Sequence, residues 1–146
     1  MWLLDVNILL YAFRADVPEH AATNAWLEAM LASGTEFHLP ELVQVGFVRV
    51  ATHSIILPQM ARPTETWDFL QVLSAQAGYR ESPSTPAIRA RWRQLCEQGN
   101  LRNNQVVDAY LAALVLTHGL TLVTHDTDFR RFRGLKVFDP LAKGKI

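Results

Sequence analysis

The stretch that decides the fold runs from Asn103 to Phe129 and reads NNQVVDAYLAALVLTHGLTLVTHDTDF. Within it, apolar residues occur almost all the way round the segment 105–118, which is the pattern of a helix packed on more than one side. Gly119 then ends the helix, because glycine accepts the left-handed conformation that commonly follows a last helical turn. The residues from Leu120 to Thr124 are β-branched or apolar and predict a buried parallel strand. The stretch therefore predicts a helix followed by a strand, the unit from which parallel α/β sheets are built.

Carboxylates stand at both ends of this helix and strand. Asp108 lies near the start of the helix and heads an apolar stripe that continues to Val115. A buried carboxylate without a partner is costly, so Asp108 lies on a cleft, carries a counter-charge, or serves the positive end of the helix dipole. The strand leads directly into a loop that contains Asp126 and Asp128. Ligands of open α/β sheets bind outside the carboxyl ends of the strands, so these acids are candidates for a binding site.

Two further acids follow predicted strands nearer the N-terminus. A buried strand at 2–4 ends at Asp5, after which Asn7 can cap a short helix. A second strand at 36–39 is followed by a helix that carries Glu41 in its first turn. Each residue also has a local explanation, since Asp and Asn are favoured helix caps and Glu suits the positive end of a helix dipole.

The rest of the chain continues the alternation of strands and helices, without an internal repeat. The segment from Asp16 to Glu19 resembles a capping sequence with proline in the first turn of a helix. The other expected elements are helices that start near Arg62 and Ser84, strands at 79–81 and 136–138, and a tail at 141–146 whose order the sequence does not define. This alternation predicts a single parallel sheet with helices on both faces.

Composition limits the class of protein. A chain of 146 residues with 49% hydrophobic and 19% charged residues is typical of one globular domain. The lone Cys96 excludes a disulfide framework and a cysteine-rich zinc site, which fits a reducing cytoplasm. No apolar run approaches the ~20 residues needed to cross a bilayer, and the N-terminus has no basic region of a signal peptide. The formal net charge of zero gives no global support to nucleic-acid binding, so such a function must rest on local patches.

Arginines provide such patches. One face of the helix that starts near Ser84 carries Arg89, Arg91 and Arg93, with Arg102 beyond it and Arg130 and Arg131 after the acidic loop. A phosphate backbone could be held there, although a solvated helix face is an equally good explanation. Arg49 could also contact a substrate, although a cation near the end of its helix suits the helix dipole.

Taken together, the acids suggest a metal site. Asp5, Glu41, Asp126 and Asp128 follow three predicted strands, and Asp108 stands at a helix start. Several like charges at one end of one sheet repel each other unless a cation offsets them. Hard oxygen ligands without cysteine or a histidine triad favour Mg²⁺ or Mn²⁺. Such ions can hold a phosphodiester and lower the pKa of a bound water.

Three segments carry a resemblance to a known family. LLDVNILLYA, PELVQVGFVRVATH and VVDAYLAALVLTHGLTLVTHDTDFRRFRGLKVFDPL resemble, in order, the PIN-domain ribonucleases of the VapC type, which are the toxins of type II toxin-antitoxin pairs. The resemblance implies a single PIN-like domain over 1–146, with a three-layer α/β/α fold around a parallel sheet of about four to five strands. It also implies RNA cleavage with Mg²⁺ or Mn²⁺, a VapB-type antitoxin that occupies the acidic groove, and a homodimer.

The resemblance also assigns roles to residues. The catalytic acids it implies are Asp5, Glu41, Asp108 and Asp126. The metal ligands it implies are Asp5, Asp108, Asp126 and, as a further acid often present, Asp128. Asn7 and Thr124 match polar positions beside the metal. Two departures are that Asn103 stands where many relatives have Gly, and Asp139 where many have Asn before Pro-Leu.

Two other functions fit part of the pattern. A receiver-type signalling module is a similar α/β domain that binds Mg²⁺ and accepts a phosphoryl group on an acid at a strand end. It needs a lysine at the end of a late strand, whereas Lys136 starts the last predicted strand. A PIN-fold binding module without catalysis is the third possibility, and the intact set of acids argues against it.

Overall fold

A parallel five-stranded sheet forms the centre of the computed structural model, which describes residues 1–53 and 59–142. The strand order is β3-β2-β1-β4-β5, and all four pairings between neighbouring strands are parallel. The strands are β1 (Trp2–Leu4), β2 (Phe37–His38), β3 (Tyr79–Arg80), β4 (Thr121–Val123) and β5 (Val137–Phe138). The predicted parallel α/β fold is therefore confirmed, with β1 at the centre of the sheet.

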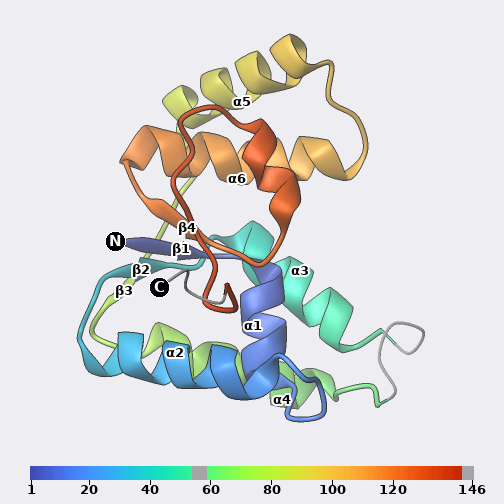
Figure 1. Cartoon of the computed structure of the whole chain (residues 1–146), viewed down its shortest axis with the longest axis vertical. Coiled ribbons are helices and arrows are strands. Elements are labelled where there is room, and N and C mark those ends of the chain that lie inside the picture. Colours follow the sequence, from blue (N-terminus) through green and yellow to red (C-terminus); the bar gives the residue numbers. More distant parts are fainter. Residues whose placement is uncertain (54–58, 143–146) are drawn as a thin grey trace.

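Helices cover both faces of the sheet. They are α1 (Val6–Phe13), α2 (His20–Ala32), α3 (Glu41–Ala51), α4 (Pro63–Ser74), α5 (Pro86–Gly99), α6 (Asn104–His118) and the short 3₁₀ helix η1 (Thr127–Arg131). Figure 1 shows α5 and α6 on one side of the strands and α2 and α4 on the other, which gives the three expected layers. Within residues 1–53 and 59–142, no helix combines the length and apolar character that a membrane span requires.

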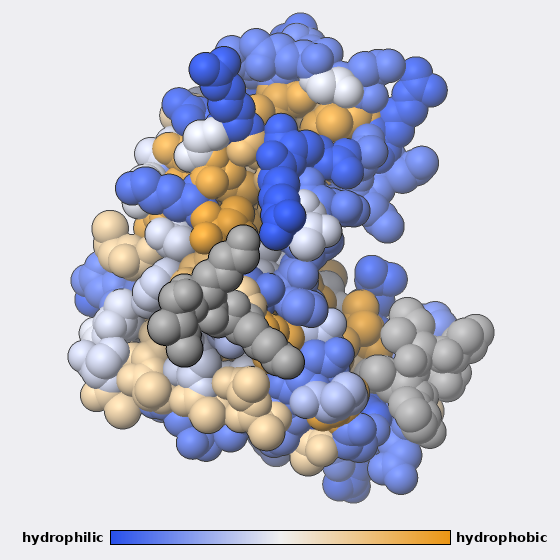
Figure 2. Space-filling view, in the orientation of Figure 1, coloured by the Kyte–Doolittle hydropathy of each residue, from blue (hydrophilic) through white to orange (hydrophobic). Residues whose placement is uncertain are grey.

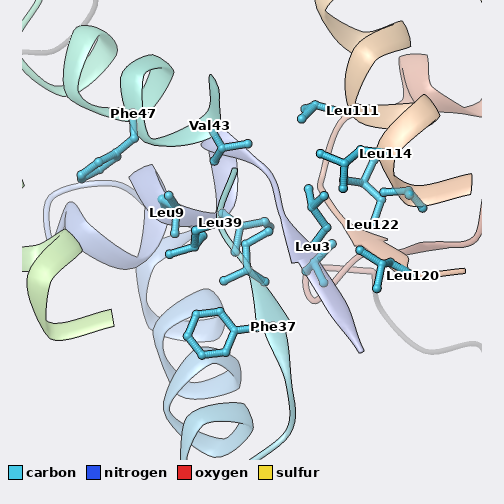
Figure 3. Close-up of a cluster of buried hydrophobic side chains, with 14 of the residues drawn as sticks. Leu3, Leu9, Phe37, Leu39, Val43, Phe47, Leu111, Leu114, Leu120 and Leu122 are labelled. Carbon is cyan, nitrogen blue, oxygen red and sulfur yellow. The ribbon is translucent and has the colours of Figure 1, made fainter. Parts of the chain in front are cut away.

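The core lies on both sides of β1. Leu3 and Leu122, on neighbouring strands, are fully buried. Figure 3 shows Leu111 and Leu114 of α6 on one side of β1 and Leu9 of α1 on the other. The run 111–115 in α6 is buried throughout, so this helix does pack on more than one side as its sequence predicts. Gly119 ends α6 with φ of 64°, the left-handed conformation expected of it.

Two helix starts differ from their sequence predictions. Asp5, rather than Asn7, is the N-cap of α1, because its carboxylate accepts the Val6 N–H. The expected cap of α2 is wrong in detail, since this helix begins only at His20 and makes no side-chain cap hydrogen bond. The Asp16 carboxylate is instead bound by the buried Arg14 guanidinium. Of the expected tail, residues 143–146 lie outside the described residues.

Candidate active site

The candidate site begins where β1 and β4 end beside each other. These strands pair in parallel, with Leu4 opposite Val123, so the residues that follow them are neighbours. The Asp5 N–H donates to the Val123 carbonyl at 3.0 Å, which extends the ladder to the first acid. The topology of the sheet therefore brings Asp5 and Thr124 together although 119 positions separate them in the chain.

Asp5 is held by three hydrogen bonds. Its Oδ1 accepts from the Val6 N–H at 2.7 Å, and its Oδ2 accepts from Asn7 Nδ2 at 3.0 Å and from the Thr124 hydroxyl at 2.8 Å. The residue is only 7% exposed. A carboxylate has about four acceptor positions, so Asp5 serves as a helix cap and still has capacity for a ligand.

Asn7 and Thr124 connect Asp5 to the acidic loop. The Thr124 hydroxyl oxygen accepts from Asn7 Nδ2 and from the Asp126 N–H, each at 3.0 Å. Asn7 Oδ1 accepts from the His125 N–H at 3.2 Å. Both polar residues that the sequence analysis selected therefore bond to Asp5 and fix the backbone of the loop that carries Asp126.

Asp108 faces the same group of acids from α6. Burial and, after it, the charges of Asp126 and Asp5 raise its pKa to about 6, while Arg131 acts in the opposite direction. Burial likewise raises the pKa of Asp5. Asp108 is not in the first turn of α6, which contains no acidic residue, so the helix-dipole explanation does not apply to it. Asp108 is instead half-buried beside the other acids, with the Arg131 guanidinium as a counter-charge.

Acids from separate segments thus form one electrostatic cluster. Its members are Asp108 and the three acids whose charges raise the pKa of Asp108, namely Asp5, Asp126 and Asp128. Asp126 caps η1, because its Oδ1 accepts from the Asp128 N–H at 2.8 Å. Both residues of this loop are exposed, unlike Asp5.

Glu41 stands apart from this cluster. It is the first residue of α3 and is exposed. In the described part of the chain, no hydrogen bond or ion pair joins it to the other acids. It lines a hollow of about 930 Å³ together with Val107 and Tyr110, which flank Asp108 on α6. Glu41 therefore lies at the rim of a groove whose lining includes none of the four clustered acids.

The groove has an apolar wall. Its lining includes Leu42 and Val45 of α3 and Val107 of α6, and these three side chains are among the exposed large hydrophobic residues. The buried face of α3 is formed instead by Val43 and Phe47. Figure 2 shows the molecule hollowed on the side where α6 begins and α3 runs. An exposed apolar wall of this kind marks an interaction surface.

The candidate arginines differ in their distance from the acids. Arg131 Nε donates to the Asp128 carbonyl at 3.0 Å, and its Nη2 lies 3.9 Å from Asp128 Oδ2. Arg130 is exposed in the same 3₁₀ helix, Arg102 is exposed just before α6, and Arg49 is exposed in the last turn of α3. Within residues 1–53 and 59–142, only Arg131 of these four has a described interaction with the acids.

A divalent ion fits the chemistry of the cluster. Its donors are all oxygen, and four carboxylates face one nearby guanidinium. As they stand, no three His, Cys, Asp or Glu side chains in the described ranges are grouped closely enough to hold a metal. Mg²⁺ commonly keeps several waters and takes only one or two carboxylates directly, so an open group of acids is compatible with it.

Three residues that border this cluster were not selected as site residues from the sequence. His125 Nδ1 lies 2.9 Å from Asp139 Oδ2, and the ring of Tyr11 meets that of His125 edge-on at 6.3 Å between centroids. Asp139 follows β5, which is the neighbour of β4. The rule that selected Asp126, an acid after a predicted strand, applies equally to Asp139, which follows the strand predicted at 136–138.

The parallel sheet and the acids along its carboxyl edge together define the class of domain. Residues 2–135 match the family model of the PIN domain, and the chain belongs to this family. Ribonuclease VapC31 of Mycobacterium tuberculosis is 32% identical over 140 residues, which are 96% of this chain and 99% of that protein. Ribonuclease VapC43 of the same organism is 35% identical over 142 residues, which are 97% of this chain and 96% of the relative.

A solved structure has the same fold. The crystal structure of VapBC2 from Rickettsia felis, bound to a DNA fragment from its promoter, superposes with a TM-score of 0.66 at 16% identity. The match covers 94% of this chain and 97% of that chain. The resemblance to PIN-domain proteins of the VapC type is therefore confirmed.

Proposed function

We propose that this chain is a metal-dependent endoribonuclease that acts as the toxin of a toxin-antitoxin pair. The observation that carries the proposal is the cluster of Asp5, Asp108, Asp126 and Asp128, which three separate segments contribute to one edge of the sheet. Relatives that match almost the whole chain are named ribonucleases. A receiver module is not favoured, because Lys136 precedes β5 rather than following it.

The cluster suits the handling of a phosphodiester. We assign Asp5, Asp108, Asp126 and Asp128 as ligands of Mg²⁺ or Mn²⁺. When bound, such an ion lowers the pKa of a coordinated water and neutralises charge that develops on the phosphate. Asn7 and Thr124 orient Asp5 through the bonds described above, which is the usual work of groups behind metal ligands.

Glu41 and the arginines complete the proposed site. Glu41 is a catalytic acid that acts from the rim of the groove, directly or through water. Arg131 limits the repulsion among the acids and can contact an RNA phosphate, since guanidinium binds phosphate oxygens well. Arg49, Arg102 and Arg130 are proposed as weaker backbone contacts, because they are exposed but lie apart from the acids.

The apolar wall of the groove supports protein partners. We propose a VapB-type antitoxin and a homodimer, and the exposed Leu42, Val45 and Val107 give both a surface to cover. The name of the Rickettsia felis assembly, VapBC2, belongs to that protein and supports an antitoxin here by analogy. The cytoplasm is the proposed compartment, in accord with the single Cys96.

Cleavage of total RNA tests this function. The chain should cut RNA with Mg²⁺ or Mn²⁺ and stop when EDTA is added, and mapping the ends identifies the substrate. Asp5→Asn should abolish cleavage while the far-ultraviolet circular dichroism stays unchanged. Asp68→Asn is the matched control, because Asp68 is an exposed acid on α4 outside the cluster. Equal cleavage by Asp5→Asn and Asp68→Asn, in preparations free of contaminating nuclease, would sink the proposal.

A further inference from the structure

His125 combines a fixed backbone with an exposed side chain. Its N–H is bound by Asn7 Oδ1, and it stands between Thr124 and Asp126, which are joined by a hydrogen bond. Its side chain is nevertheless 43% exposed at the border of the acidic cluster. A side chain that is this exposed adds little to the hydrophobic core. The His125 ring is therefore available to contact a ligand.

Asp139 fixes the ring of His125. Its Oδ2 lies 2.9 Å from His125 Nδ1, and its Oδ1 accepts from the Leu141 N–H at 2.8 Å. The hydrogen bond from the Leu141 N–H fixes the orientation of the Asp139 carboxylate, so Asp139 is a rigid acceptor. A partly exposed hydrogen bond of this kind contributes little to stability, but it does select one rotamer.

Tyr11 supplies a second ring from α1. The two rings make an interplanar angle of 70°, which is an edge-to-face arrangement. The Tyr11 carbonyl oxygen lies 2.8 Å from His20 Nδ1. This contact holds the backbone of Tyr11 in place. Burial raises the pKa of the phenol, and nearby Glu19, Asp126 and Asp139 raise it further, so the hydroxyl keeps its proton.

The charges around these rings select the kind of group that can lie on them. Carboxylates of Glu19, Asp126 and Asp139 surround Tyr11, and they repel a phosphate. The face of a nucleobase is uncharged, and its exocyclic amino groups can donate to carboxylates. Single-stranded RNA is commonly read by stacking of bases on Tyr, Phe, Trp or His. A base next to the scissile phosphate therefore fits these rings better than the phosphate itself.

We propose that His125 and Tyr11 form a nucleobase-stacking platform beside the acidic cluster, and that Asp139 is the positioning residue that holds the His125 ring. The inference rests on the proposed ribonuclease function and deepens it by naming the part of the RNA that is held. It assigns no acid-base chemistry to His125. A structural pin between the loop and the C-terminal segment is the competing role for the pair of His125 and Asp139.

Binding of RNA without cleavage tests the platform. The probes are short single-stranded RNAs that carry one 2-aminopurine, measured in EDTA with the full chain. Stacking quenches 2-aminopurine fluorescence, and anisotropy of a terminal dye gives Kd. His125→Ala should weaken Kd by about 5- to 100-fold and remove the quenching, in line with alanine substitutions of other stacking residues. His125→Phe should retain part of the quenching and lose less affinity than His125→Ala, because it keeps a stacking ring but not the hydrogen bond to Asp139.

The positioning role has its own pair of variants. Asp139→Ala should weaken binding, whereas Asp139→Asn should weaken it less, because the amide oxygen can still accept a hydrogen bond from the ring although the NH2 group cannot accept the Leu141 N–H. Trp67→Ala is the control, since Trp67 is an exposed aromatic residue on α4, and its Kd should equal that of the unmodified chain. In cleavage assays, His125→Ala should raise KM more than it lowers kcat.

The outcomes separate this inference from the proposed function. Cleavage of RNA by the unmodified chain, combined with equal Kd and quenching for His125→Ala, would overturn the platform and leave the ribonuclease intact. Equal losses in His125→Phe and His125→Ala would also overturn it, since an aromatic ring at this position would then contribute nothing to binding. Absence of metal-dependent cleavage by the unmodified chain would instead refute the proposed function.

Discussion

The Thr124 hydroxyl donates to Asp5 Oδ2 at 2.8 Å and joins the ends of two adjacent parallel strands. The same oxygen accepts from Asn7 and from the backbone N–H of Asp126. One buried hydroxyl thus connects the innermost acid to the loop that carries the outer acids. Its loss should affect stability and metal binding together.

Thr124→Val tests this connection. The substitution keeps the shape but leaves Asp5 Oδ2, Asn7 Nδ2 and the Asp126 N–H each with one partner fewer, next to the buried carboxylate of Asp5. We expect a loss of about 1–3 kcal/mol in the free energy of unfolding by urea. Affinity for Mn²⁺ by calorimetry should fall about 10- to 100-fold, as for other residues that orient metal ligands. Thr124→Ser keeps the hydroxyl and should stay close to the unmodified chain in both measurements.

The raised pKa of Asp108 predicts how stability depends on pH. Folded Asp108 keeps its proton up to a pKa of about 6, whereas the ordinary pKa of an Asp side chain is 3.8. The folded state therefore binds more protons between these values, and its stability falls as pH rises through this window. Asp108→Asn should abolish this part of the pH dependence and be more stable than the unmodified chain at pH 7 in EDTA. Urea titrations at pH 4 and pH 7 check this, and a larger advantage at pH 4 would contradict it.

The sheet could be predicted because each of its parts is local. Buried runs such as 120–124 and the glycine stop at Gly119 depend on residues close in sequence, and parallel strands place their carboxyl ends at one edge. The grouping of Asp5 with Asp126 follows from that rule once both strands are identified. Local patterns and one topological rule were thus sufficient for most of the cluster.

Strand order and helix faces were beyond the sequence. Asp139 reaches His125 only because β5 is the neighbour of β4, which no local pattern reveals. The exposure of Leu42 and Val45 could not be predicted either, because the sequence pattern of a helix is the same whether its apolar residues face a core or a groove. Glu41 follows a strand as Asp5 and Asp126 do. As the exposed first residue of α3, however, it lies at the rim of the groove and apart from those acids.

Two buried threonines offer a paired test of hydrogen-bond energetics. Thr23 and Thr66 are both fully buried in helices, but the Thr66 hydroxyl donates to the Pro63 carbonyl at 2.6 Å, whereas Thr23 Oγ1 has no partner among the described residues. Valine has the same shape without the hydroxyl. Thr23→Val should therefore stabilise the chain by about 1 kcal/mol, and Thr66→Val should destabilise it by a similar amount. Urea unfolding measures both, and a loss of stability in Thr23→Val would contradict the unpaired hydroxyl.

A comparison of Arg131 with Arg130 tests whether one particular arginine, rather than positive charge in general, offsets the acids. Arg131 lowers the pKa of Asp108 and lies 3.9 Å from Asp128, whereas Arg130 is exposed beside it without a described bond to the acids. Arg131→Met should therefore raise the pKa of Asp108 above its value of about 6, while Arg130→Met should leave it unchanged. Carboxyl ¹³C chemical shifts of Asp108, followed from pH 4 to pH 8 in EDTA, report the midpoint directly. Equal midpoints in the two variants would mean that Arg131 does not balance the cluster, and its role would then reduce to holding η1 through the Asp128 carbonyl.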